Sequence, residues 1–352
     1  MDKPKIYIAD LGMITPVGFN AQMTTASVKA GIASINEVEF YDHDYNAVRM
    51  STVPDEALET AVDATEVIMP LTARQYRLLQ LSTLAISGID ALLPKDHMVP
   101  VFLAGPQNIL EKEPSIDKHF LDNLAEQSNI NIDLESSRCI TTGRAGGLDI
   151  IDTAFKYFET SRAQFVIVGG VDTYYDKAII NYYVEQQRIL TMESMDGFIP
   201  GEGAGFLLLV SEQAPDSIIK KCKSYMTLPG SGFEEGYIGS LEPYTGSGLS
   251  TAIQNTFATS EIEGIKFIMS SMNGENYFAK ELGVAITRNR SNISDNFTVQ
   301  HIAEYCGDMG AAIGPVMIGI LHNRNSVKQP PGLVYCSSDS GFRSAVCVDT
   351  NS

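Results

Sequence analysis

The sequence lacks several features that would assign it at once to a broad class of protein. It has no apolar run approaching the roughly 18 residues that a membrane-spanning helix needs. Its N-terminus, Met-Asp-Lys-Pro-Lys, leads into a predicted strand without an apolar signal segment. Its five cysteines form no CxxC pair and show no metal-ligand spacing with histidine. We therefore expect a cytoplasmic protein with reduced thiols and no bound metal.

Positive charge is also scarce. The chain has 25 Lys and Arg residues against 43 Asp and Glu residues, which gives a net charge of −18. This balance argues against nucleic acid and against an anionic membrane surface as partners. The 44% of hydrophobic and 19% of charged residues are those of an ordinary globular protein, and 352 residues suffice for one large domain or two fused ones.

Predicted strands and helices alternate along the chain. In the first half we expect strands at 6–9, 99–104, 164–171 and after 202, and helices at 21–31, 71–93 and 115–127. The second half repeats this alternation, with strands at 218–226, 265–269 and 297–301, helices at 245–258, up to about 285 and up to about 322, and a hairpin over 332–337 and 343–349. Two such halves, 1–215 and 216–352, predict a duplicated, layered α/β fold.

The stretch from Cys139 to Phe158 is the most informative. It predicts a short strand, a tight glycine-containing turn and a helix with one apolar face. Several enzyme families present a nucleophile at such a turn, where the helix N-terminus points at it. Here the residue at the turn is Arg144, which stays protonated and cannot attack a carbonyl. The sequence therefore predicts the architecture of an active site with an unsuitable residue at its centre.

A second glycine-rich stretch runs from Asp196 to Gly205, in the sequence Asp-Gly-Phe-Ile-Pro-Gly-Glu-Gly-Ala-Gly. Glycines at this spacing can form a dinucleotide-binding loop, but that loop must be followed by a helix. The apolar residues that follow here predict a strand instead. We therefore expect no dinucleotide and no other cofactor.

The order of these landmarks resembles the β-ketoacyl synthase family. Gly12-Met-Ile-Thr-Pro-Val-Gly18 is similar to that family's opening GMVTPLG, and Asp196 to Gly205 is similar to its DGFVPGEGAG, the most specific match. Gly310-Ala-Ala-Ile-Gly314 resembles its late GAAG element. The resemblance covers almost the whole chain and implies the thiolase-like fold, with duplicated βαβαβαββ halves in a layered α-β-α-β-α sandwich.

The family's chemistry requires a cysteine and two histidines, and the resemblance places other residues at all three positions. Arg144 aligns with the cysteine, Asn273 with the first histidine and Gly307 with the second. The family's lysine has no counterpart in 300–305, and Ser338-Asp-Ser-Gly341 replaces its gating GFGG loop. The resemblance therefore implies a degenerate member with no catalytic residues.

This pattern favours a binding, scaffold or adaptor subunit without condensing activity. Degenerate members of this kind occur in gene clusters of bacterial secretion machines, so an effector is one candidate partner. One alternative is a chain-length-factor-like partner of an active ketosynthase in fatty-acid or polyketide synthesis, because those subunits also lack the cysteine. Acyl carrier proteins are acidic, however, and a chain of net charge −18 matches them poorly.

A second alternative is an acyltransferase with a relocated nucleophile, for which Cys306, near His301 and Asp308, is the candidate. Residues so close along one strand and turn rarely point at a common centre, so we favour a structural role for Cys306. Arg144 either binds an anionic ligand or a partner carboxylate, or pairs internally with Glu202 or Asp308. Arg144, Glu202, Asn273 and Asp308 are therefore the candidate ligand or partner site.

The resemblance also implies a dimer, which we expect to be a homodimer. We predict that residues 165–169, an apolar segment without charge or proline, form the sheet edge that pairs across the interface.

Overall fold

The computed structural model describes residues 3–89, 93, 97–110, 114–192, 194–323 and 330–351. Its first half contains β1 (Lys5–Ile14), α1 (Ala21–Lys29), β2 (Asn36–Tyr41), β3 (Ala47–Met50), α2 (Asp55–Leu58), η1 (Ala64–Glu66), α3 (Ala73–Ile86), β4 (Val101–Ala104), α4 (Lys118–Gln127), β5 (Arg138–Ile140), η2 (Gly143–Ala145), α5 (Gly146–Thr160), β6 (Phe165–Thr173), α6 (Lys177–Glu185) and β7 (Glu202–Ser211). Its second half contains α7 (Asp216–Ile219), β8 (Ser224–Thr227), β9 (Gly230–Phe233), α8 (Ser247–Ala258), β10 (Ile265–Ser270), α9 (Asn276–Arg288), η3 (Arg290–Asn292), β11 (Ile293–His301), α10 (Ala303–Cys306), η4 (Gly310–Ala312), α11 (Ile313–His322), β12 (Gly332–Ser337) and β13 (Phe342–Thr350).

The sheet shows the duplication directly. The first half contributes strands in the order β5-β4-β6-β7-β1, and the second contributes β11-β10-β12-β13-β8. Strands β2 and β3 form a separate two-stranded sheet, and β9 pairs with β13 outside this order. If the five remaining strands of each half are counted along the chain, both orders are third, second, fourth, fifth, first. The pattern of pairing is also the same, since the first three strands in each order pair in parallel and the last two pair antiparallel. Antiparallel pairing of β1 with β8 joins the halves.

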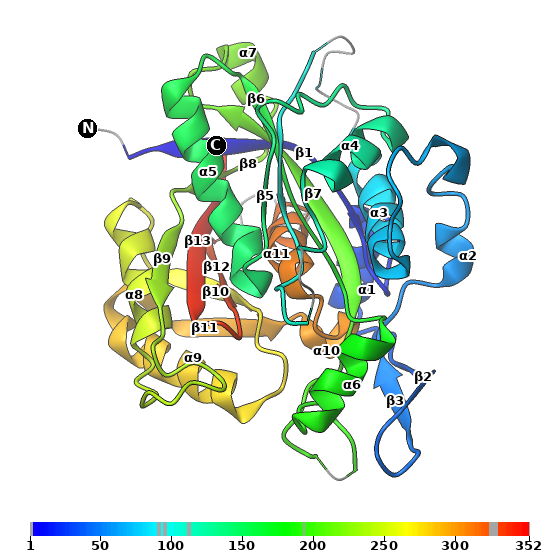
Figure 1. The fold of residues 1–352 in the computed structure, drawn as a ribbon. Helices are drawn as coiled ribbons and strands as arrows, with labels where there is room; N and C mark the ends of the chain where they lie inside the picture. Colours follow the sequence, from blue (N-terminus) through cyan, green and yellow to red (C-terminus); the bar gives the residue numbers. More distant parts are fainter. Residues whose placement is uncertain are drawn as a thin grey trace.

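Three apolar cores separate the layers. Figure 1 shows how the helices are arranged about the sheet. Helices α3 and α4 cover the outer face of the first half, α8 and α9 cover the outer face of the second, and α5 and α11 lie between the two. Along β6, Ile167 faces the outer core and Val166 and Val168 face the central one. Because both faces of such strands are covered, their sequences are continuously apolar. The fold is therefore the predicted layered α/β fold with duplicated halves.

The two central helices touch where each carries a glycine. A Cβ on Gly147 of α5 would lie 2.4 Å from the carbonyl oxygen of Ala311 and 2.7 Å from Cδ of Pro315. A Cβ on Gly314 of α11 would lie 3.1 Å from the carbonyl carbon of Gly147. The glycine cluster of the sequence thus serves close helix approach, which a side chain would prevent.

Each central helix also begins in the same way. A glycine with positive φ opens a short 3₁₀ turn, namely Gly143 (φ 73°) before α5 and Gly310 (φ 48°) before α11. The two helix N-termini are therefore presented by equivalent turns, one from each half.

Several predicted elements differ from the structure. The prediction that 165–169 forms a free sheet edge is wrong, because β6 lies inside the sheet and pairs with both β4 and β7. The edge of the first half is β5. The predicted strand at 218–226 is shorter, since α7 precedes β8. The predicted helix over 71–93 ends at Ile86, and residues 90–92 lie outside the described residues.

Candidate functional site

Arg144 lies in the turn between β5 and α5, where the sequence predicts it. Its side chain is buried at the start of a central helix. Its side chain is only 3% exposed. The guanidinium donates to Oδ2 of Asp308 through Nε at 2.7 Å and also through Nη2. Its Nη1 donates to Oδ1 of Asp339 at 2.7 Å. The ring of Phe278 lies 5.1 Å from the guanidinium carbon, so the cation also lies over an aromatic face.

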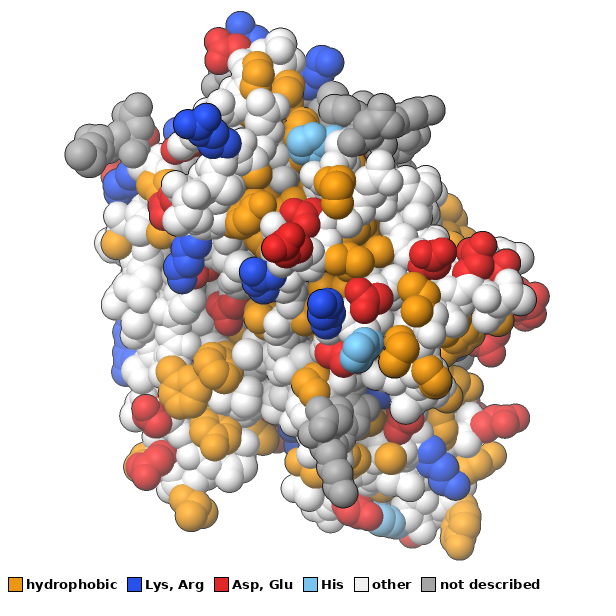
Figure 2. Space-filling view, turned by 45° about the horizontal axis from the view of Figure 1, so that its top comes forward, with side chains coloured by type: hydrophobic (Ala, Val, Ile, Leu, Met, Phe, Trp, Pro, Cys, Tyr) orange, Lys and Arg blue, Asp and Glu red, His pale blue; other side chains and the backbone are white. Residues whose placement is uncertain are grey.

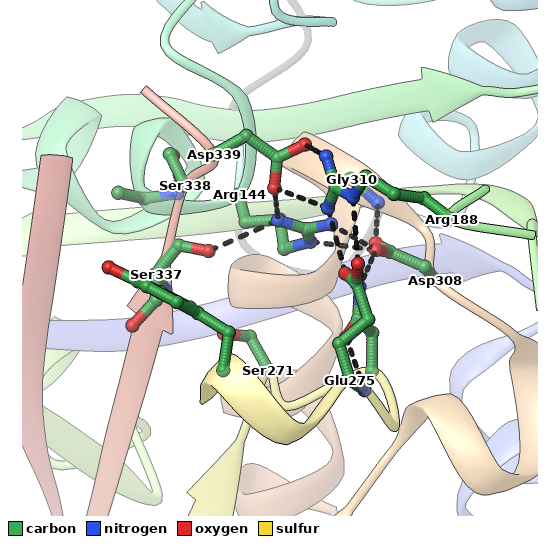
Figure 3. Close-up of polar contacts among 12 residues, drawn as sticks. Arg144, Arg188, Ser271, Glu275, Asp308, Gly310, Ser337, Ser338 and Asp339 are labelled. Carbon is green, nitrogen blue, oxygen red and sulfur yellow. Dashed lines mark hydrogen bonds and ion pairs between the residues drawn. The ribbon is translucent and has the colours of Figure 1, made fainter. Parts of the chain in front are cut away.

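The contacts of Arg144 continue into a closed ring of side chains (Figure 3). The amide of Asn273 donates to Asp308 Oδ2 at 3.0 Å and to Glu275 Oε2 at 2.9 Å. Arg188 donates to both oxygens of Glu275 at 2.7 Å and to Oδ2 of Asp339 at 2.7 Å. Both arginines come from the first half, whereas Asn273 and the three carboxylates come from the second. We call these six residues, Arg144, Arg188, Asn273, Glu275, Asp308 and Asp339, the ion-pair ring.

Burial and ion pairing have opposite effects on the pKa values of these side chains. Burial by itself lowers the pKa of Arg144, but Asp308 and Asp339 raise it well above its ordinary value. Burial by itself raises the pKa of Asp339, but Arg144 and Arg188 lower it below its ordinary range. The arginines and Asp339 therefore keep their charges at neutral pH. Removing one partner would leave a buried charge without compensation, which is costly.

The loop between β12 and β13 closes over the α5 N-terminus. Oγ of Ser338 accepts a hydrogen bond from the Ala145 N–H at 2.9 Å and donates to the carbonyl oxygen of Thr142 at 2.5 Å. Asp339, the next residue of this loop, binds both arginines of the ring. The backbone N–H of Ala145, in the turn before α5, is thus already hydrogen-bonded within the protein.

Little space remains beside the ring. A cavity of about 10 Å³ is lined by Arg74, Pro106, Gln107, Ile109, Gly143, Arg144, Asp172, Tyr174, Tyr183 and Asp339. This is room for about one water molecule. In it, Oδ1 of Asp172 has no hydrogen bond and lies 3.5 Å from Nη2 of Arg74. Burial raises the pKa of Asp172 to about 6, despite the opposing effect of Arg74.

The structure brings together three of the predicted site residues, Arg144, Asn273 and Asp308, but not the fourth. Glu202 was predicted to join them and does not, because its carboxylate accepts hydrogen bonds from Arg77 at 2.7 Å, from the Thr173 hydroxyl at 2.7 Å and from the Val53 N–H at 2.8 Å. Arg77 is thus the ion-pair partner of Glu202 in the Gly-Glu-Gly turn.

Gly307 and Cys306 lie beside the ring in sequence. Gly307 has φ 63°, and a Cβ there would lie 2.8 Å from the carbonyl oxygen of Pro200. Cys306 is fully buried, and burial raises the pKa of its thiol to about 12. Asp308, the acid of the Cys-His-Asp alternative, is bonded to Arg144, Asn273 and the Gly310 N–H.

Sequence reasoning missed Arg188, Glu275 and Asp339. Asp339 stands in the segment that replaces the gating loop, so an acidic residue there was visible in the sequence. Glu275 lies two residues after Asn273, but nothing in the sequence links either acid to Arg188.

Among the described residues, no helix is both long and apolar enough to cross a membrane. The described part of the chain also contains no group of three or more His, Cys, Asp or Glu side chains able to hold a metal ion.

Comparisons with known proteins agree with this architecture. Residues 136–214 match the family profile described as β-ketoacyl synthase, N-terminal domain. No curated protein matches the sequence. Among solved structures, the ishigamide ketosynthase/chain length factor is similar, with a TM-score of 0.77 and 15% identity over 99% of this chain and 100% of that chain. The ketosynthase from module 6 of the bacillaene synthase of Bacillus subtilis 168 has a TM-score of 0.76 and 14% identity, covering 99% and 72%.

A third similar structure is the complex AntDE:AntF, a type II polyketide synthase acyl-carrier protein with its ketosynthase. Its TM-score is 0.77 at 15% identity, covering 99% of this chain and 100% of that chain. At such identities the structures show a shared fold. Together with the match over 136–214, they show that this chain has the α/β fold of the ketosynthase structures.

Proposed function

We propose that this chain is a ketosynthase-fold subunit without condensing activity, which works by binding another protein as a scaffold or adaptor. The observation that carries this proposal is Arg144, which stands where the resemblance places the nucleophilic cysteine. A guanidinium is not a nucleophile at any physiological pH. Its ion pairs with Asp308 and Asp339 also leave a cavity of only about 10 Å³ beside it.

The other two positions agree with this proposal. Asn273 stands at the position of the first histidine, and Gly307 at that of the second. Neither residue can exchange a proton near neutral pH, as a histidine does. The Asn273 amide donates instead to Glu275 and Asp308, which makes it part of the ring.

An acyltransferase with Cys306 as a relocated nucleophile has less support. A thiol of pKa about 12 has almost no thiolate at neutral pH, and the thiolate is the nucleophile. The candidate acid of the triad, Asp308, neutralises an arginine.

A chain-length-factor-like partner of an active ketosynthase remains the second candidate. Its support is that one of the similar structures is a ketosynthase/chain length factor and that the shared fold covers 99% of this chain and 100% of that chain. A bacterial secretion effector is the other partner that the sequence resemblance suggested, and it is part of the scaffold proposal.

We further propose a homodimer formed through β5. Within the described sheet this strand pairs only with β4, so its other edge is free for a second chain. Cys139 and Ile140 on it are only half-buried.

The test of the proposed function is chemical. The full chain is incubated with acyl thioesters and with a malonyl thioester, beside an active ketosynthase as positive control. We expect no covalent adduct by intact mass and no release of carbon dioxide. A stoichiometric adduct that disappears in Cys306→Ser would overturn the proposal in favour of the relocated nucleophile. Co-purification with a co-expressed ketosynthase, together with aggregation of the chain alone, would favour the chain-length-factor alternative.

A further inference from the structure

A separate lobe extends from the layered body at the lower end of Figure 1, where β2, β3 and α6 lie. We define the accessory lobe as residues 36–50 and 174–201, without residue 193. It has its own apolar cluster, in which Val48 and Met50 of β3 pack with Ile180 and Tyr183 of α6 and with Phe198. Two tips project from this cluster, namely the β2–β3 turn and the loop that follows α6.

Both tips contain an unusual backbone conformation. In the described part of the chain, the non-glycine residues with positive φ are Tyr45 (φ 62°), in the β2–β3 turn, and Gln187 (φ 54°), just after α6. Glycine or asparagine adopts this conformation readily, whereas a bulky residue such as tyrosine is strained in it. The Tyr45 side chain is 86% exposed, so no packing within this chain offsets that strain.

Large apolar side chains are exposed at the same tips. Met192 is 91% exposed and Met195 is 80% exposed in the loop after α6, and Tyr41 is 53% exposed at the end of β2. At the lower right of Figure 2, hydrophobic side chains lie beside acidic and basic ones. Methionine and tyrosine are enriched at protein interfaces, because one is adaptable and the other combines an apolar ring with a polar end.

A cavity opens between the two tips. Its volume is about 60 Å³, and it is lined by Asp42 and His43 of the hairpin turn and by Val184, Gln187, Ile189, Thr191 and Ser194 of the other tip. Sites for drug-sized molecules and cofactors are several times larger, at roughly 300 Å³ or more. This cavity instead has room for the end of one side chain. Gln187, one of the two strained residues, is part of its wall.

The charged residues of the accessory lobe indicate whether its partner is acidic or basic. Segment 36–46 contains Glu37, Glu39, Asp42 and Asp44 and no Lys or Arg. On the other tip, Glu185 and Asp196 are exposed, whereas Arg188 turns inward to the ion-pair ring. The exposed cations of the lobe are Arg49 and Lys177. The tips therefore present an acidic surface around apolar side chains, which complements a basic partner.

We infer that the accessory lobe is a docking surface for a basic segment of another protein, whose Lys and Arg side chains face the acidic tips and whose single apolar side chain enters the cavity. Two features carry the inference independently of the charge: strained residues on both tips and exposed methionines beside them. The inference deepens the proposed function, because it states the chemistry of the partner that a scaffold subunit would bind.

Methionine methyl NMR on the full chain tests this directly. The probe is a short Lys/Arg-rich peptide with one central leucine. Matched peptides have serine in place of that leucine or glutamate in place of the basic residues. We expect the first peptide to shift the methyl resonances of Met192 and Met195 and to leave that of Met98 unchanged. Met98 is 62% exposed but lies outside the lobe, which makes it an internal control. The serine peptide should bind more weakly, and the glutamate peptide not at all.

Charge variants provide the second arm. Asp44→Asn/Glu185→Gln, one substitution on each tip, should weaken binding of the first peptide by about threefold to tenfold, since each exposed ion pair contributes a few tenths to one kcal/mol. Glu261→Gln/Glu263→Gln removes the same charge from an exposed loop elsewhere and should leave binding unchanged. Three results would overturn the inference: an equal loss of peptide affinity in both double variants, a shift of the Met98 methyl resonance, or no methyl shift with any peptide.

Tyr45→Gly distinguishes a binding role from a structural one. Glycine relieves the backbone strain at φ 62°, so this variant should melt at a higher temperature and yet bind the peptide more weakly. A lower melting temperature with unchanged binding would show that Tyr45 serves the fold and not a partner. These outcomes are separable from the thioester test, because a catalytically active chain could still bind the peptide and an inactive chain could fail to.

Discussion

Arg144 of the first half and Asn273 of the second donate hydrogen bonds to the same atom, Oδ2 of Asp308, with the Nε and Nδ2 donors at 2.7 and 3.0 Å. One carboxylate oxygen thus ties together the two positions that the family resemblance aligns with a nucleophile and a histidine. The interaction is buried, since Arg144 is 3% and Asn273 is 7% exposed. Ion pairs therefore connect the two halves at the centre of the molecule.

Arg144→Ala should destabilise the fold strongly. It leaves Asp308 with only the Asn273 amide and the Gly310 N–H as partners, and Asp339 with Arg188 as its remaining guanidinium. By analogy with other broken buried pairs, this costs about 3–5 kcal/mol. Urea denaturation measures this cost, with the exposed Arg162→Ala as the control expected to stay within about 0.5 kcal/mol. Arg144→Lys keeps the charge but not the planar fork, so its stability should lie between the two. A cost below about 1 kcal/mol for Arg144→Ala would contradict the role assigned to the ring.

Gly147→Ala should also destabilise the protein, for a steric reason. The new methyl group would lie 2.4 Å from the carbonyl oxygen of Ala311 in η4 and 2.7 Å from Cδ of Pro315 in α11. The central helices would therefore have to separate, at a cost of about 1–3 kcal/mol. Gly283→Ala is the matched control within α9, because a Cβ there meets nothing within 4 Å. The control should be about 0.5–1 kcal/mol more stable than the wild type, since alanine favours a helix. Thermal or urea unfolding measures the stability of both variants. Similar stabilities of Gly147→Ala and Gly283→Ala would contradict the close approach of the helices.

Asp172 should give stability a dependence on pH that Asp172→Asn lacks. Burial raises its folded-state pKa to about 6, above the value of about 3.9 for an unfolded chain. Its contribution is therefore fully present below about pH 4 and is lost as the pH rises through about 6. The free energy of unfolding of the wild type relative to Asp172→Asn should fall by on the order of 1–3 kcal/mol across that window. A difference that stays constant between these pH values would contradict the raised pKa.

The cysteines should be inert in the folded protein. Burial raises the thiol pKa of Cys139, Cys306 and Cys347 to about 12 and that of Cys222 to about 11. At neutral pH a thiol-alkylating reagent should modify the native chain only slowly and the urea-unfolded chain at all five positions. Rapid modification of Cys306 in the native chain would show an accessible, activated thiol there.

Static light scattering should show a dimer for the purified chain. The free edge of β5 and the half-buried Cys139 and Ile140 on it are the surface that we expect to pair. The particle mass should remain that of two chains on dilution, because obligate interfaces of this kind bury roughly 2,000 Å² or more. A monomer that stays soluble at high concentration would contradict the homodimer proposal.

Much of the fold was predictable because its signals are local. Residues 265–269 and 332–337 are short apolar runs that predict buried strands, and Gly147 with its neighbours predicts a close turn or approach. The long stretch from Asp196 to Gly205 supported the resemblance to β-ketoacyl synthases. The edge at 165–169 was predicted wrongly, because a continuous apolar run shows that a strand is covered on both faces but not which strands lie beside it.

The sequence by itself determined the strand–turn–helix that presents Arg144 and the need of that buried cation for an anion, since a charge taken out of water requires a partner. Only the tertiary structure decided which anions these are. Glu202 was an equally good candidate from the sequence but is held by Arg77, whereas Asp308 and Asp339 approach Arg144 from chain segments more than a hundred residues away. Ion pairing depends on distances of a few ångströms between side chains, and those distances are fixed by the packing of the two halves and not by any local pattern.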